Sequence, residues 1–78
     1  MKRENAGYEI IKEEHYTVAY EIVLGERKNA QGEVTGYVTW ECKNETDYFW
    51  GHYFASNQFC EAMKDYYTRL AERFDLHF

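Results

Sequence analysis

Two aromatic-rich runs, joined by a short polar segment, constrain the fold more than any other feature of this sequence. The runs cover residues 37–42 and 48–54, and the polar residues 43–47 between them are few enough to form a hairpin loop. Aromatic and β-branched residues, which dominate both runs, favour strands. We therefore expect an antiparallel hairpin at the centre of the fold.

A chain of 78 residues is near the lower size limit for a domain held by a single core. Leu, Ile, Val and Phe are scarce enough to raise the question of disorder. Eight tyrosines and two tryptophans answer it, because aromatic side chains bury large areas. We expect one ordered domain over residues 1–78, with residues 1–7 as a flexible lead-in.

The balance of charge argues against nucleic acid as a partner. Nine Lys and Arg are scattered among fourteen Asp and Glu, for a net charge of -5, whereas nucleic-acid binders show a basic stripe. Residues 1–5 are followed by no apolar run, and no stretch approaches the length of a membrane span. These features predict a cytoplasmic protein that does not bind membranes, with Cys42 and Cys60 as reduced thiols.

Alternation of apolar and polar residues over 16–24 predicts a strand with one buried side. Upstream, residues 8–12 are either a short strand or a tail against the sheet edge, and residues 13–15 indicate a break. Residues 25–32 are charged and amide-rich, as expected for a hairpin loop.

Burial predicts the register of the first hairpin. Residues directly opposite on antiparallel strands point the same way, so we expect Ile22 to face Trp40 and Leu24 to face Val38. A loop of five residues that ends in a bulge at Gly32 gives this register.

The strand over residues 48–54 carries aromatic residues on both sides, so its buried face is left open. Gly51 in its middle indicates a bulge, or room for a neighbouring ring.

A C-terminal helix follows, with Ser56 or Asn57 as N-cap. The apolar stripe of this helix consists of Phe59, Met63, Tyr66 or Tyr67, Leu70 and Phe74. Asp65 and Arg69 are spaced to form an ion pair on its polar side.

These elements predict an α+β fold: an antiparallel meander of three or four strands with one C-terminal helix packed across one face. One helix covers one side of such a sheet, so the other side is expected to be exposed. The residues expected there are Tyr37, Thr39, Val23, Ala19 and one aromatic set of the third strand. This face is either solvated or a contact surface.

The function that we expect is a small interaction or accessory module rather than an enzyme. It would associate with itself as a homodimer, or with another protein, through the aromatic face or a sheet edge. Its anchors would be Tyr37, Trp50 and Tyr53. Base stacking on the aromatic face is a further interpretation, but few cations lie near.

The alternative is a small-molecule or nucleic-acid binding domain with its site between helix and sheet, near His52 and Cys42. A thiol beside an imidazole is a potential nucleophile, whereas the simpler interpretation is a buried Cys42 and a rim His52. The register of the second hairpin decides whether the two share a face. The potential metal ligands are His15, His52, His77, Cys42 and Cys60. They lack the spacing of known metal motifs, so neither a metal nor a cofactor is predicted.

The runs 37–42 and 47–54, together with Tyr8-Glu9-Ile10-Ile11, resemble small uncharacterised proteins carried by conjugative or phage-like elements of Gram-positive bacteria. The resemblance covers about half of the chain. It implies a bacterial cytoplasmic accessory protein, and no specific activity.

Overall fold

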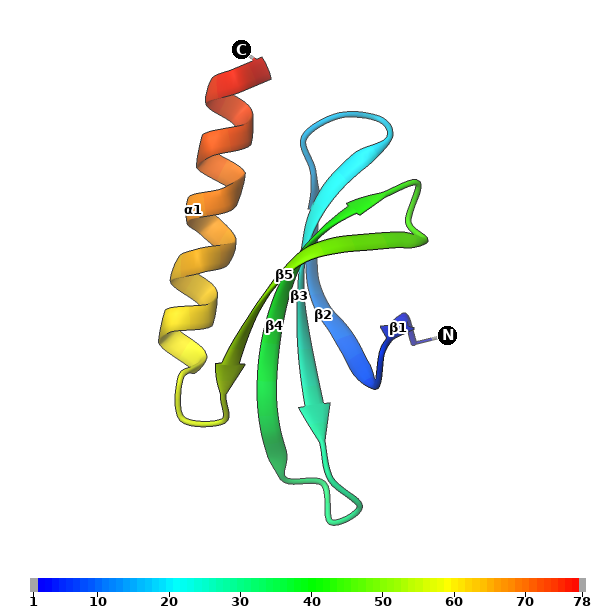
Figure 1. Ribbon diagram of the computed structural model, residues 1–78, viewed down its shortest axis with the longest axis vertical. Helices are drawn as coiled ribbons and strands as arrows, with labels where there is room; N and C mark the ends of the chain where they lie inside the picture. Colours follow the sequence, from blue (N-terminus) through cyan, green and yellow to red (C-terminus); the bar gives the residue numbers. More distant parts are fainter. Residues whose placement is uncertain (1, 78) are drawn as a thin grey trace.

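The computed structural model describes residues 2–77, and the side chains of residues 2–75. Within this range, five strands form one antiparallel sheet in chain order, and a single helix follows them (Figure 1). The elements are β1 (Glu4–Asn5), β2 (Tyr8–His15), β3 (Tyr20–Lys28), β4 (Val34–Lys43), β5 (Asp47–Ala55) and α1 (Phe59–His77). The predicted α+β class, antiparallel sheet and C-terminal helix are confirmed. The sheet has five strands instead of three or four.

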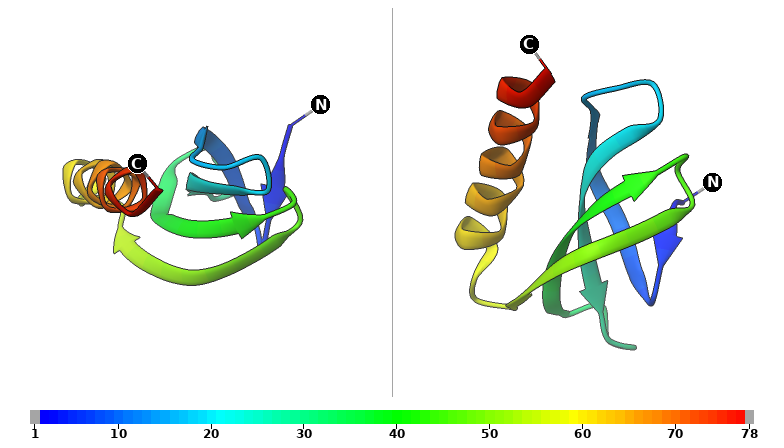
Figure 2. Two further views of the ribbon diagram at one scale, coloured as in Figure 1. Left: turned by 90° about the horizontal axis from the view of Figure 1, so that it is seen from above. Right: turned by 45° about the horizontal axis from the view of Figure 1, so that its top comes forward.

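The sheet curls into an open half-barrel (Figure 2). Strands β2 and β5 are separated by two others, yet the rings of Tyr8 and Tyr53 are only 6.2 Å apart. Arg3, just before β1, donates a hydrogen bond to the Tyr48 hydroxyl of β5 at 2.8 Å. The curl therefore brings the two ends of the sheet together over one face, which we call the inner face.

The opposite face, which we call the helix face, packs against α1. Its buried apolar side chains are Ile22, Leu24, Tyr37, Ala62, Tyr66 and Leu70. The predicted apolar stripe of the helix is confirmed in its centre, where Tyr66 is buried and Tyr67 exposed. The predicted ion pair between Asp65 and Arg69 is also present, at 3.6 Å.

The inner face holds a second core. Its buried members are Val23, Val38, Trp40 and Cys42, with Tyr8, Ile10 and Tyr48 packed around them. Both faces of β3 and β4 are consequently buried, although one helix covers only one of them. The expectation that Val23, Tyr37 and Thr39 lie on an exposed face is therefore wrong. The curl of the sheet buries Val23 in the inner core, and α1 covers Tyr37 and Thr39.

The loop between β3 and β4 has the predicted length. Lys28 lies opposite Val34, so residues 29–33 form a five-residue loop. Gly32 in this loop has φ of 80°, a conformation that glycine adopts without steric cost.

The register beyond that loop differs from the prediction by one residue. Arg27 lies opposite Gly36, so Thr35 is an additional residue on β4, and this bulge shifts all later pairs. The pairs that follow are Leu24 with Thr39, Val23 with Trp40 and Ile22 with Glu41. A shift of one residue exchanges the faces, so Ile22 and Trp40 lie on opposite sides of the sheet.

The N-terminal half is more regular than the sequence suggests. Residues 4–5, expected within a flexible lead-in, form β1 and pair with β2, and residues 13–15 continue β2 where a break was expected. The break lies at residues 16–19, and β3 begins only at Tyr20.

The helix begins slightly later than predicted. The residue before it is Gln58, whose side chain accepts a hydrogen bond from the Ala55 N–H at 2.8 Å. Ser56 and Asn57 belong to the preceding turn, so neither is the N-cap. In the described part of the chain, no helix is both long and apolar enough to cross a membrane.

Candidate functional site

A bulge in β5 turns Trp50 toward solvent. Thr39 of β4 lies opposite His52 and Glu41 lies opposite Phe49, so Trp50 and Gly51 together stand opposite the single residue between them on β4. Trp50 has φ of 53° and is 65% exposed. Positive φ is rare for a bulky residue, and such strain gathers at functional sites.

Gly51 makes this bulge compatible with the inner core. The indole of Trp40 packs directly against its backbone, so that a Cβ placed there would lie 2.8 Å from Nε1. The prediction of a bulge or of room for a ring at Gly51 is thus confirmed in both respects.

The ring of Trp50 lies between two neighbours. It makes an edge contact with Phe49, with ring centroids 4.9 Å apart, and the Arg73 guanidinium lies 5.7 Å from its ring. Arg69 donates a hydrogen bond to the Trp50 carbonyl, which fixes the bulge to α1.

Tyr53 is the second exposed aromatic residue of β5, with 64% of its surface accessible. Its ring contacts Trp40 and Tyr8 on the inner face. The Ala55 N–H donates to the Gln58 side chain, which lies outside the sheet, so this N–H points away from β4. Because backbone direction alternates along an antiparallel strand, the polar groups of Tyr53 point outward as well.

A cleft of about 300 Å³ separates α1 from the sheet beside Trp50. On its wall, Arg69 Nη2 lies 2.9 Å from His52 Nε2, and His52 Nδ1 lies 3.0 Å from Asp65. Arginine only donates, so Nε2 accepts and Nδ1–H donates to the carboxylate. Burial lowers the pKa of Arg69, and its Nη1 is buried without a hydrogen-bond acceptor among the described residues.

Glu41 forms the floor of the same cleft. Its side chain accepts hydrogen bonds from Tyr16 and, at 2.7 Å, from Arg73. Burial and the hydrogen bond to Glu41 raise the pKa of Tyr16. The carboxylate is thus buried but fully paired.

The sequence-predicted site residues separate in space. Trp50 and Tyr53 are exposed, but Tyr37 is only 7% exposed and packs against Phe59 of the helix, so its expected place on an exposed face is wrong. Cys42 lies in the core of the inner face and His52 at the rim of the helix face. They cannot act together, which agrees with the simpler interpretation of the pair.

A different group joins His15, which the sequence offered as a potential metal ligand, with Glu21 and Glu45, which it did not. The donor atoms of His15, Glu21 and Glu45 all lie within 4.8 Å of one another. No spacing motif indicates this group, because the three residues come from β2, β3 and the turn before β5. Of the other histidines, His52 is on the far face, and the His77 side chain lies outside the described residues.

No family model, curated protein or solved structure matches the chain. The resemblance to proteins of mobile elements, and the cytoplasmic location that goes with it, therefore stay predictions.

Proposed function

We propose that this protein is a small interaction module that associates with a second copy of itself through the edge of β5. The observation that carries the proposal is Trp50, a bulky residue in a left-handed conformation with an exposed ring on an end strand of the sheet. A left-handed conformation costs a non-glycine residue about 1–2 kcal/mol. A function for the exposed ring would explain why this cost is retained.

The backbone of the edge supports the same proposal. Among the described strands, β5 pairs with β4 alone, and the polar groups of Tyr53 point outward. Edge strands that remain unpaired are usually protected by charged residues, proline or a bulge. Residues 48–55 contain no lysine, proline or carboxylate. The bulge of β5 is confined to Trp50 and Gly51, so residues 52–55 beyond it form a regular edge. Two β5 strands can therefore pair in antiparallel fashion, with Trp50 and Tyr53 as the aromatic anchors.

Two substitutions of matched exposure test the edge. Tyr53→Lys introduces the charge that natural edge strands use against pairing, whereas Tyr67→Lys places the same charge on the exposed side of α1. In sedimentation equilibrium we expect the wild type and Tyr67→Lys to dimerise and Tyr53→Lys to remain monomeric. Equal association of the two variants would refute pairing through β5.

Ionic strength distinguishes self-association from binding to a basic partner. Two copies with a net charge of -5 each repel one another, so added salt should strengthen the dimer. Weaker association at high salt would mean that attractive ion pairs, and not the apolar edge, hold the copies together.

A second candidate function is binding of a small anionic molecule in the cleft between α1 and the sheet. The buried Nη1 of Arg69, which has no acceptor among the described residues, favours it. Sodium acetate and sodium phosphate are suitable probes. Saturable chemical-shift changes at Arg69 and at the Trp50 indole would support the cleft, and uniform small changes would exclude it.

A further inference from the structure

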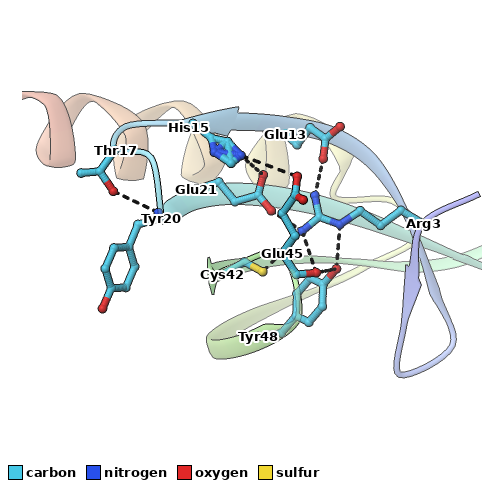
Figure 3. Close-up of polar contacts among 9 residues, drawn as sticks. All are labelled: Arg3, Glu13, His15, Thr17, Tyr20, Glu21, Cys42, Glu45 and Tyr48. Atoms are coloured by element: carbon cyan, nitrogen blue, oxygen red, sulfur yellow. Dashed lines mark hydrogen bonds and ion pairs between the residues drawn. The ribbon is translucent and has the colours of Figure 1, made fainter.

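The end of the half-barrel near the β4–β5 turn contains a compact polar cluster on the inner face (Figure 3). His15, the last residue of β2, lies directly opposite Glu21 of β3. The turn places Glu45 beside them, and two of its three residues, Asn44 and Glu45, have positive φ. Three separate segments thus contribute donors to one point.

Glu21 is the unusual member of this cluster. Its side chain is only 1% exposed. One oxygen accepts a hydrogen bond from Arg3, but Oε2 is buried and has no hydrogen-bond partner among the described residues. A buried carboxylate oxygen without a partner is costly, and it indicates a missing ligand or proton.

The atoms beside Glu21 Oε2 are of types that commonly bind metal ions. His15 Nε2 lies 3.4 Å from Glu21 Oε2 and 3.8 Å from Glu45 Oε1. A zinc ion with ligand distances of about 2.0–2.2 Å holds its ligand atoms roughly 3.4 Å apart. The imidazole and the Glu45 carboxylate are both exposed, so small rotations suffice to reach this spacing.

The surrounding charge favours a cation. Arg3 is bonded to Glu13 and Glu21 and also approaches the backbone carbonyl of Glu45. Around it stand the carboxylates of Glu13, Glu21 and Glu45, so this cluster remains net negative with one guanidinium present. A divalent cation would neutralise the excess negative charge.

We propose that His15 Nε2, Glu21 Oε2 and Glu45 Oε1 bind a divalent transition-metal ion such as Zn²⁺, with water at the remaining position. One imidazole and two carboxylates suit zinc or manganese better than calcium or magnesium, which prefer oxygen ligands alone. The ion joins β2, β3 and the β4–β5 turn at one end of the sheet.

Cys42 is excluded as a further ligand. Its Sγ is not among the donor atoms that lie within 4.8 Å of one another. Its Sγ already lies 3.4 Å from Nη2 of Arg3.

The test is isothermal titration of the full-length, chelator-treated protein with ZnCl₂ at pH 7.5. We expect one zinc site in the wild type. The zinc affinity of His15→Ala and of Glu45→Gln should be about 10-fold weaker or more, which is the usual effect of removing a group that supports a metal site. The matched control is His52→Ala, which removes a histidine that also lies beside a carboxylate, but on the other face. It should leave zinc affinity unchanged.

A second measurement identifies the site directly. In NMR spectra, zinc should shift the ring signals of His15 and leave those of His52 in place. The thermal midpoint should rise with zinc concentration in the wild type and not in Glu45→Gln, whose exposed position keeps the fold intact. Equal zinc affinity in all variants would overturn the proposal. So would the absence of binding at micromolar zinc, which would mean that His15 donates its proton to Glu21 instead of binding a metal.

Discussion

The backbone of Gly51 lies directly against the indole of Trp40. A Cβ atom at Gly51 would be 2.8 Å from Trp40 Nε1 and 3.1 Å from its Cδ1. Trp40 is buried in the inner core, so its ring has little freedom to retreat. This contact ties the bulge that exposes Trp50 to the packing of the opposite side of the sheet.

Gly51→Ala should therefore destabilise the fold by about 1–3 kcal/mol, the usual cost of overpacking a core. Gly32→Ala is the control, because nothing lies near a Cβ there and only its positive φ is strained. Chemical denaturation measures both variants. A loss at Gly51 no larger than that at Gly32 would mean that the indole does not require this glycine.

Tyr37→Ala should unfold the protein partly and not act on association alone. Tyr37 is buried against Phe59 under α1, and removal of a buried aromatic ring costs about 3–5 kcal/mol. Thermal denaturation by circular dichroism tests this. An unchanged midpoint would show that the ring is not part of the core.

Arg73→Met should also destabilise the protein, by about 3 kcal/mol, because it leaves the buried Glu41 with one donor fewer. Arg73→Lys retains the charge and should recover part of the loss. Urea denaturation compares the two variants. Equal losses would assign the effect to the packing of the Arg73 side chain and not to its charge.

The two cysteines should react with a thiol reagent at very different rates at pH 7. Cys60 is exposed and should react at once, whereas Cys42 is buried with its pKa raised to about 11 and should react only on unfolding. His52→Ala should leave the rate at Cys42 unchanged, since the two lie on opposite faces. Fast labelling of Cys42 in the wild type would contradict this geometry.

The raised pKa of Cys42 also gives stability a pH dependence. The folded thiol holds its proton to higher pH than the unfolded thiol, whose ordinary value is 9.0. The stabilising contribution of the protonated Cys42 thiol to the free energy of unfolding is therefore fully present below pH 9. It declines as the pH rises toward 11. Cys42→Ala should flatten this decline in denaturation curves measured between pH 8 and pH 11.

Local sequence signals predicted the parts of the fold that depend on local chemistry. The strands over residues 34–42 and 48–54, the five-residue loop, the helix and the role of Gly51 all follow from periodicity and turn residues. The predicted register of β3 and β4 was wrong because a single extra residue, Thr35, shifts the strand pairing. No pattern in the sequence indicates that bulge, since both faces of β3 and β4 carry apolar residues.

The candidate sites could be predicted only in part. Trp50 and Tyr53 were both expected as exposed anchors, although strict alternation would expose only one of the two. The bulge at Gly51 breaks the alternation and exposes both. The curl of the sheet, which buries Cys42 in the inner core, was not expected, and neither was the shifted register that places Tyr37 under α1. The cluster of His15, Glu21 and Glu45 depends on strand pairing and on a turn, so residues distant in sequence meet there without a motif.

The most direct test of the interaction module is the behaviour of Trp50→Gly in sedimentation equilibrium. Glycine accepts positive φ, so relief of strain offsets the lost ring contacts, and the free energy of unfolding should stay within about 1 kcal/mol of wild type. The wild type should approach twice the 9.4 kDa mass of one chain, while the folded variant stays at one. A wild type that remains monomeric at about 1 mM, or a variant that still dimerises, would contradict the account.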